Sequence, residues 1–396
     1  MFLIQAGHQS STHIAEAVPE DGAAGAIWSL ADETPDNLQV RMRALSGEGV
    51  TQAIDPQLYV ALLADANPKR LADHNLFKVP LPRQSRYSAR RLASMVEAIV
   101  KHQAELPGTH LIAPTVAVSS MNHRSAQVAL DLAETAVDVW GDYNDERPLL
   151  ISVALERTAL ADPKGINQLL DELTAQDFDG YYLMFEIDPG LDASMQAVLL
   201  SEALYVSYTL SVVREKLVWV GYSGLTGYLH RAVGASAFAA GFFQKQQWWS
   251  LGHWGPPARG RTPRARIVLD SILGSLLIET ELAAARSQRY DSLLGNDLLI
   301  GAGPLARALR EGNSPNTDRS TCAAQLFAVC EELDRRISTD LDANLARLID
   351  DIEAAELLYQ RIEDAGVPLE PRSTSRQLNA WLEAIELFKK RAEFVV

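Results

Sequence analysis

The sequence has little cysteine. Cys322 and Cys330 are the only two among 396 residues, so a disulfide framework is excluded, and two thiols alone cannot complete a structural zinc site. The histidines show no paired metal-binding spacing, and the chain carries no Walker loop, nucleophile-elbow serine or Rossmann fingerprint. None of these common motifs therefore names a reaction.

Positive charge is also in short supply. Lysine and arginine number 36 against 51 aspartates and glutamates, which gives a net charge of -15. Such a chain repels polyanions on average, so a phosphate or nucleic-acid site requires a local basic patch. No apolar run reaches the length of a membrane span, and the first residues lack both a basic leader and a long apolar core. We expect a cytoplasmic protein with no membrane partner.

What the sequence does contain is a series of short apolar runs, each suited to a buried strand. They cover residues 2–6, 24–29, 50–54, 110–118, 149–155, 181–187, 217–221 and 237–241. Helical patterns lie between the later runs, at 89–105, 123–140, 163–175 and 193–215, whereas 35–45 is a poor helix. Strands alternating with helices predict a parallel α/β fold, and eight repeats favour a closed (β/α)8 TIM-like barrel. An open doubly wound sheet is the alternative.

The chain divides into three parts by composition. We predict a barrel over 1–290, closed by a helix at 265–288, then a connector over 291–315 and a helical extension over 316–396. Within the extension, one apolar stripe follows helical spacing along Leu341, Leu345, Leu348, Ile352, Ala355, Tyr359 and Ile362. Together with the last helix it predicts a helical hairpin. The hairpin packs either on the barrel or on another subunit or partner protein, since periodicity does not identify the covering surface.

Acidic side chains end several of the predicted strands. The C-terminal ends of barrel strands form the active face, and Asp55, Glu156, Glu186 and Asp188 all fall there. Because Glu156 and Glu186 end adjacent strands, their carboxylates are candidates for acid–base catalysis, or for holding Mg²⁺ with Asp188. The competing interpretation pairs each glutamate with a neighbouring arginine and makes Asp55 a turn residue.

Glycines surround the last two predicted strands. Gly221, Ser223 and Gly224 follow one strand and Gly241 follows the next, so their backbone N–H groups are candidates for binding phosphate. The same glycines are also what tight turns after strands require.

The segment 244–266 is the one sizeable cationic stretch and contains no acid. It combines three tryptophans with basic residues: Trp248, Trp249, Trp254, Lys245, Arg259, Arg261, Arg264 and Arg266. Tryptophans among cations stack bases in single-strand binders. They also form lids over anionic small molecules, or simply pack as a structural loop.

These features leave two functional hypotheses. The first is a hydrolase or transferase acting on a phosphorylated or nucleotide-like substrate at the C-terminal face of the barrel, with carboxylates as acid–base groups or Mg²⁺ ligands. The second is a non-catalytic subunit that binds single-stranded nucleic acid through 244–266 and docks a protein, or a second copy of itself, through the helical tail. The sequence does not decide whether the protein is an enzyme.

Overall fold

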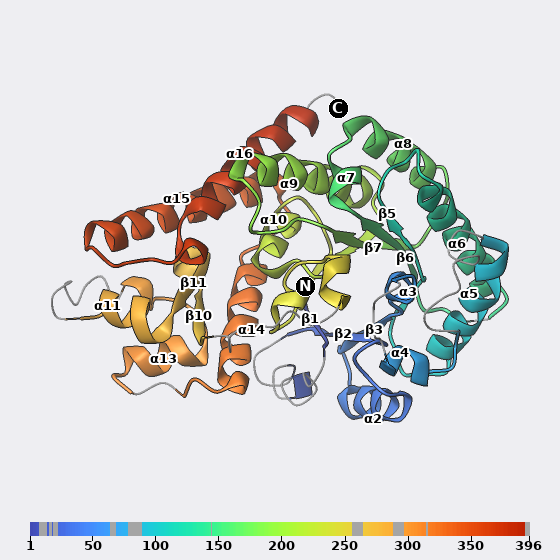
Figure 1. Cartoon of the computed structure of the whole chain (residues 1–396), viewed down its shortest axis with the longest axis horizontal. Helices are drawn as coiled ribbons and strands as arrows, with labels where there is room; N and C mark the ends of the chain where they lie inside the picture. Colours follow the sequence, from blue (N-terminus) through green and yellow to red (C-terminus); the bar gives the residue numbers. More distant parts are fainter. Residues whose placement is uncertain are drawn as a thin grey trace.

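One curled parallel sheet organises the molecule (Figure 1). The computed structural model describes residues 1–7, 14–15, 18, 23–63, 69–77, 89–143, 145–255, 264–287, 297–313 and 316–392. The strand order is β3-β2-β1-β9-β8-β7-β6-β4, and β5 also pairs with β6. The strands are β1 (Phe2–Gln5), β2 (Gly25–Ser29), β3 (Thr51–Asp55), β4 (Leu111–Ile112), β5 (Ala117–Val118), β6 (Leu149–Leu155), β7 (Gly180–Phe185), β8 (Leu217–Val220) and β9 (Ala237–Ala240). Nearly every residue in them is buried, as expected for a parallel sheet covered on both faces.

The curvature of the sheet brings distant strands together. Strands β3 and β7 lie five places apart in the strand order, which in a flat sheet would separate them by roughly 24 Å. Yet the Tyr182 hydroxyl of β7 lies 3.4 Å from the Asp55 carboxylate at the end of β3. The sheet therefore curls until inward side chains from opposite walls meet.

Closure into a complete barrel is not confirmed. Within the described residues no β-ladder joins β3 to β4, the two ends of the sheet. The ends approach where the backbone N–H groups of Thr109 and His110 donate to the carbonyl oxygen of Gln52 and the Thr109 hydroxyl accepts from the Gln52 backbone N–H at 2.9 Å. The expected strand at 110–118 is also interrupted. Pro114 has no N–H to give to a ladder, and β4 and β5 pair with β6 on either side of it.

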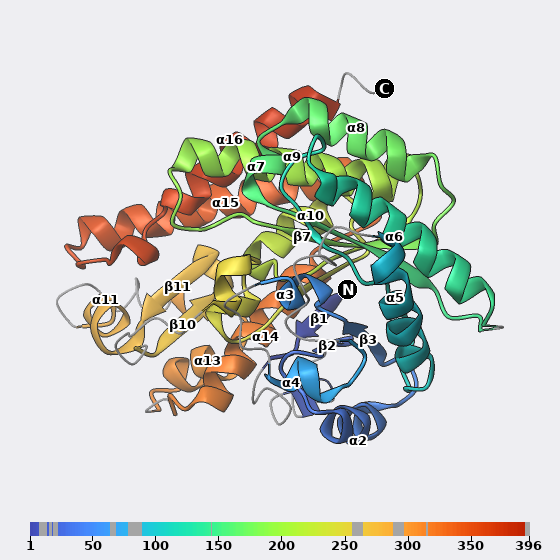
Figure 2. The same cartoon turned by 45° about the vertical axis from the view of Figure 1, so that its right-hand side comes forward.

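Helices surround the outside of the curled sheet, as Figures 1 and 2 show for α5, α6, α8 and α9. The helices up to the end of the sheet are α2 (Pro35–Leu45), α3 (Leu58–Ala61), α4 (Lys69–Asp73), α5 (Ala89–Ala104), α6 (Arg124–Gly141), α7 (Arg157–Leu160), α8 (Pro163–Thr174), α9 (Ala193–Tyr208) and α10 (Gly227–Ala232). The poor helix expected at 35–45 is in fact the regular helix α2. Thr34 caps it, Pro35 begins it, and Leu38 and Met42 bury one side.

A β-hairpin replaces the first half of the closing helix predicted at 265–288, so that prediction was wrong over 266–277, whereas 278–285 is helical. Strands β10 (Arg266–Leu269) and β11 (Gly274–Leu277) pair antiparallel. They are joined through Leu273, whose φ of 46° is left-handed. A Cβ on Gly274 would lie 2.3 Å from the Tyr359 hydroxyl, so the close approach of the last helices requires glycine there. The apolar residues that suggested a helix instead alternate along two short strands.

The C-terminal helices cover the hairpin and the sheet. They follow the short α11 (Ala283–Ala285) and are α13 (Pro304–Arg310), α14 (Arg319–Arg335), α15 (Leu341–Asp364) and α16 (Arg376–Ala392). Six residues of the predicted stripe, from Leu345 to Ile362, are buried within the single chain, and Leu341 packs at its edge. Helix α16 lies along α9 in both views (Figures 1 and 2). A second subunit is therefore not needed to cover the stripe.

One segment, Ala193–Val213, is long and apolar enough to cross a membrane by length and composition alone. It comprises α9 and the π-helical turn that follows, and 72% of the apolar window is buried inside the protein. Its apolar surface packs against α16 and its other neighbours, as in the core helix of a soluble protein.

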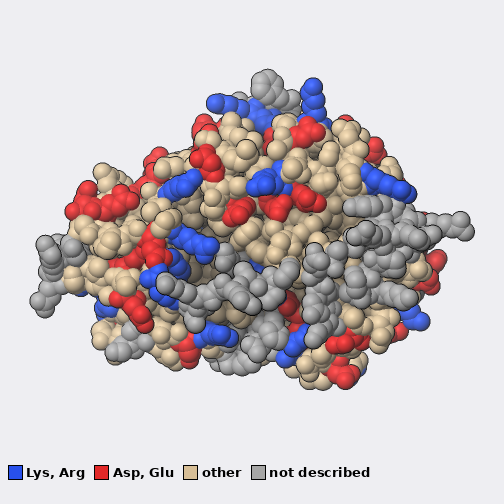
Figure 3. Space-filling model, viewed as in Figure 1, with Lys and Arg blue, Asp and Glu red and all other residues tan. Residues whose placement is uncertain are grey.

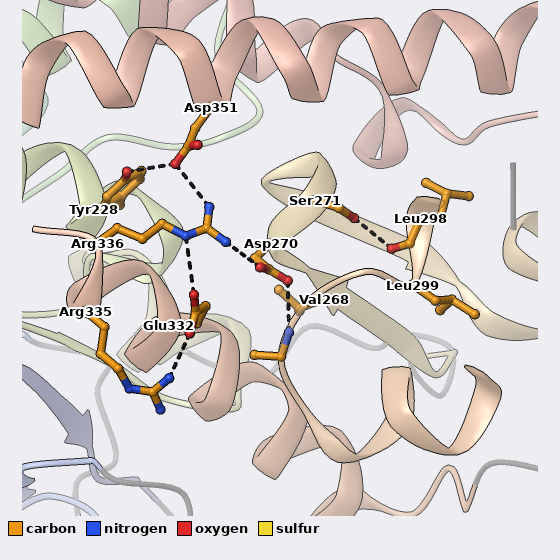
Figure 4. Close-up of polar contacts among 12 residues, drawn as sticks. Tyr228, Val268, Asp270, Ser271, Leu298, Leu299, Glu332, Arg335, Arg336 and Asp351 are labelled. Carbon is orange, nitrogen blue, oxygen red and sulfur yellow. Dashed lines mark hydrogen bonds and ion pairs between the residues drawn. The ribbon is translucent and has the colours of Figure 1, made fainter. Parts of the chain in front are cut away.

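A partly buried ionic cluster joins the hairpin to the C-terminal helices (Figure 4). The Arg336 guanidinium contacts Asp270 at 2.6 Å and Asp351 at 3.1 Å, and the Tyr228 hydroxyl donates to the same Asp351 carboxylate at 2.8 Å. Arg336 caps the end of α14, and its partners come from the β10–β11 turn, α15 and α10. Because each charge is paired, the cluster holds the extension in one position on the sheet.

Candidate functional site

Asp55 is the centre of a polar cluster inside the curled sheet. It ends β3 and is only 1% exposed. One carboxylate oxygen accepts hydrogen bonds from the hydroxyls of Tyr59 at 2.8 Å and Tyr222 at 2.9 Å. The Tyr182 hydroxyl lies 3.4 Å from the same oxygen and donates its single proton over the shorter distance of 3.1 Å to the Gln5 amide oxygen. The other carboxylate oxygen accepts from the Gln57 backbone N–H at 3.0 Å. Three donors therefore converge on one buried carboxyl group, with a third tyrosine hydroxyl beside them.

Burial determines the protonation of this cluster. Desolvation raises the pKa of Asp55 to about 6, although the tyrosine and backbone hydrogen bonds act in the opposite direction. Burial and the nearby Asp55 charge raise the pKa values of Tyr59, Tyr182 and Tyr222 well above their usual range. The tyrosines therefore stay protonated at neutral pH, whereas Asp55 titrates close to it.

Two strained backbone positions support the cluster. Gln57 and Tyr222 both have a φ of 52°, which is uncommon for residues other than glycine. The Gln57 side chain is held by Ser29 at 2.6 Å and donates to the Tyr222 hydroxyl at 2.9 Å. Left-handed backbone at non-glycine residues persists where surrounding contacts enforce it and gathers at functional sites.

The tryptophan-rich segment after β9 covers the cluster. Trp249 is fully buried and meets the Tyr59 ring edge-on, with centroids 5.6 Å apart. Trp254 packs in the same manner against Tyr59 at 5.6 Å and Tyr222 at 6.1 Å. We call residues 245–255 the Trp segment.

Two polar ties fasten the Trp segment to the strand ends. The Lys245 ammonium lies 2.7 Å from the Asp32 carboxylate, which follows β2. The Ser250 hydroxyl donates to Glu186, just after β7, at 2.6 Å. The ties reach opposite sides of the sheet, so the Trp segment spans the mouth above Asp55.

The predicted glutamate pair lies at this rim, apart from the buried Asp55. Burial and the negative charge of Glu186 together raise the pKa of Glu156, so the two carboxylates are close enough to interact. Glu186 also accepts from the Arg157 backbone N–H at 3.2 Å. Asp188 instead accepts from the Gly190 backbone N–H at 2.7 Å, closing a local turn. Among the described side chains no group of three His, Cys, Asp or Glu residues is placed to hold a metal ion, so the structure lends no support to the suggested Mg²⁺ site.

The glycine-rich turns use several of their donors internally. The N–H groups of Gly221, Ser223 and Gly241 donate to the carbonyl oxygens of Leu183, Ala239 and Gln246, respectively. A Cβ on Gly221 would lie 2.3 Å from the Tyr182 hydroxyl, and one on Gly224 would lie 2.7 Å from the Gln247 carbonyl oxygen. These glycines make room for the Asp55 cluster and the Trp segment. Phosphate binding by the turns stays a prediction.

The cations of 244–266 that the structure describes are paired with acids. Lys245 contacts Asp32, while Arg264 and Arg266 both contact Glu370 in the C-terminal extension. Trp248 is half-buried, and its ring lies edge-on to His253 at 4.2 Å. Arg259 and Arg261 lie outside the described residues. On the face drawn in Figure 3, the described Lys and Arg side chains are interspersed with Asp and Glu.

Comparison with known proteins adds no assignment to this geometry. No model of a known protein family matches the sequence, and no curated protein matches it significantly.

Sequence reasoning found Asp55 but missed most of its partners. Tyr59 had one available signal, since it follows Asp55 by only four residues, in the short helix α3. Tyr182 lies in the middle of an apolar strand, and Gln5 ends another, so neither pattern indicated a shared site. Their approach depends on how far the sheet curls.

Proposed function

We propose that the protein is an enzyme, a hydrolase or transferase, that acts on a nucleotide-like substrate beneath the Trp segment, with Asp55 as its general acid and base. One observation carries the proposal. A fully buried carboxyl group at the C-terminal end of a parallel strand accepts hydrogen bonds from two tyrosine hydroxyls, has a third 3.4 Å away, and has a pKa of about 6. Parallel α/β proteins place their ligands at this end of the strands.

The pKa of Asp55 suits proton transfer near neutral pH. A general acid or base works best when its pKa lies close to the working pH, because both protonation states are then accessible. Tyr59 and Tyr222 keep the carboxyl group oriented and stabilise its ionised form. Their hydroxyls lie 3.4 Å apart, so both donate to the same carboxylate oxygen from adjacent positions.

The aromatic surroundings favour a substrate with a flat ring. Trp249 and Trp254 from the Trp segment, with Tyr59 and Tyr222 below them, enclose the carboxyl group. Aromatic side chains bind bases by stacking. Since Asp55 is covered, the Trp segment moves aside to admit the ring, and its two ties break and reform during each cycle. A phosphate on the substrate would meet cations beyond Lys245, which is already paired with Asp32.

The non-catalytic hypothesis receives less support. It required the cations of 244–266 to be free for a nucleic-acid backbone, yet those in the described part of the chain are paired with Asp32 or Glu370. The tail stripe is buried within one chain, so a protein partner is not needed to cover it. We also propose a cytoplasmic location, which agrees with two buried, unpaired cysteines.

The test combines binding with turnover. We would titrate the protein with adenosine, guanosine, cytidine, uridine and their 5′-monophosphates, following tryptophan fluorescence. Products would be separated chromatographically to detect release of base or phosphate. We expect at least one compound to bind and react, and Asp55→Asn to abolish turnover while keeping the fold.

Glu186→Gln serves as the matched variant, because it also removes one carboxylate at the strand ends. We expect it to retain turnover, since Glu186 lies at the rim and binds Ser250. If Glu186→Gln abolishes turnover and Asp55→Asn does not, the rim carboxylates carry the chemistry and the assignment of Asp55 is wrong.

A further inference from the structure

Gln246 occupies an unusual position between two glycines at the mouth of the sheet. Its side chain lies so close to the backbone after β1 and β9 that a Cβ on Gly7 would fall 1.2 Å from its amide nitrogen. A Cβ on Gly241 would fall 2.5 Å from its amide oxygen. Two glycines are therefore needed to place this one side chain, which is 1% exposed.

Among the residues that the structure describes, the amide nitrogen of Gln246 has no hydrogen-bond acceptor. Its orientation is determined, because the amide oxygen accepts from the Phe243 backbone N–H at 3.1 Å and a backbone donor cannot be reversed. Other buried glutamines behave differently. Gln52, Gln103 and Gln325 each use both ends of the carboxamide.

Two more buried polar groups without a partner lie in the same region. Gln5, which is fully buried on β1 next to β9, binds the Tyr182 hydroxyl at 3.1 Å through one end of its amide and leaves the other end unpaired. The indole N–H of fully buried Trp249 is also unpaired. Buried donors are nearly always bonded in native proteins. Unpaired indole N–H groups also occur at Trp219 and Trp381, so the two glutamines, Gln5 and Gln246, which both lie against Gly241, are the observation that requires an explanation.

We propose that Gln246, with Gln5 and Trp249 beside it, forms a subsite that donates hydrogen bonds to the acceptor atoms of a nucleobase-like ring. The acceptor atoms of such a ring are its carbonyl oxygens and those ring nitrogens that carry no hydrogen. Each of them can accept a hydrogen bond from the Gln246 amide N–H. This inference rests on the proposed function and specifies which part of the substrate is recognised. Gly7 and Gly241 then serve to position Gln246, and Gln246 determines specificity.

The test replaces Gln246 with methionine, which has a similar length and no donor. We would titrate the four nucleosides, and indole as a ring without an acceptor, into the intact protein and measure binding by isothermal titration calorimetry. The wild type should prefer nucleosides to indole. Gln246→Met should weaken nucleoside binding by about tenfold or more and leave indole binding unchanged.

Gln325→Met provides a matched control, since Gln325 is equally buried and fully bonded far from Asp55. It should lower the melting temperature and leave nucleoside binding unchanged. Gln246→Met should lower the melting temperature less than Gln325→Met does. It removes one hydrogen bond, from the Phe243 backbone N–H, together with a buried donor that lacks a partner, whereas Gln325→Met removes four hydrogen bonds.

The outcomes separate the two proposals. If the wild type binds a nucleoside and Gln246→Met binds it equally well, the subsite is wrong and the proposed function stands. If Gln246→Met melts as low as Gln325→Met, Gln246 is structural and the subsite is again wrong. If the wild type binds no nucleoside or nucleotide, the proposed function and the subsite are both wrong.

Discussion

The raised pKa of Asp55 should make the folded protein lose stability as pH increases. A carboxyl group whose pKa is higher in the folded state than in the unfolded chain stabilises the fold when protonated. That contribution is complete below the ordinary pKa of 3.8 and is lost as pH rises through about 6. Ionising Asp55 in its buried position therefore opposes folding at neutral pH.

The size of the effect follows from the shift. Moving from 3.8 to about 6 is close to two units, and each unit corresponds to about 1.4 kcal/mol, so the loss amounts to about 3 kcal/mol. The asparagine in Asp55→Asn cannot ionise, yet its oxygen still accepts from Tyr59 and Tyr222. The variant should thus lack this part of the pH dependence.

The assay is urea denaturation of both proteins at a series of pH values from about 4 to about 8. The difference between the two unfolding free energies isolates Asp55, because other titrating groups contribute equally to both. Glu202, whose pKa is raised to about 7 by burial, is one such group. We expect the wild type to lose about 3 kcal/mol relative to Asp55→Asn across this range.

A constant difference across the whole range would refute the reasoning. It would mean that Asp55 has the same pKa in the folded and unfolded chains, so that the tyrosine hydrogen bonds offset its burial completely. The pKa argument for proton transfer near neutral pH would then fail with it.

Three other changes have clear expected results. Gly227→Ala would place a Cβ 2.0 Å from the ring of buried Phe238 and should lower the free energy of unfolding, measured by thermal denaturation, by about 2 kcal/mol. An unchanged melting temperature would show that the ring moves freely. Arg391→Met removes the cation beside Glu202 and should raise the pKa of that carboxyl group further. The free energy of unfolding, measured by urea denaturation, should therefore fall by about 3 kcal/mol above pH 7 and by much less at pH 5. Equal losses at both pH values would contradict this expectation. Trp249→Ala empties a fully buried position in the Trp segment and should lower the free energy of unfolding by about 3–5 kcal/mol. It should also increase the quenching of the remaining tryptophans by acrylamide. Unaltered quenching would show that the Trp segment stays closed.

The sequence alone determined which segments form the sheet and most of its helices. Each strand is a short apolar run, and burial on both faces leaves that pattern in the chain itself. The stripe from Leu345 to Ile362 likewise records a helix with one buried side, and six of its residues are buried as predicted. Asp55 was a candidate because it ends a strand, and the end of a strand can be predicted from neighbouring residues in the sequence.

Tertiary structure decided which residues share the site. Gln5, Tyr182 and Tyr222 meet Asp55 only because the sheet curls, and curvature depends on how all the strands pack together. The pairing of Lys245 with Asp32 joins residues 213 positions apart, so composition suggested a free cation where the fold supplies a partner.

Tertiary contacts also decided that residues 266–277 form a hairpin. Its apolar residues fit a helix as well as two strands, and the choice was made by packing against the last helices and by the ion pair of Asp270 with Arg336. Local patterns report how deeply a residue is buried, whereas its partners are determined by contacts between segments that are distant in the chain.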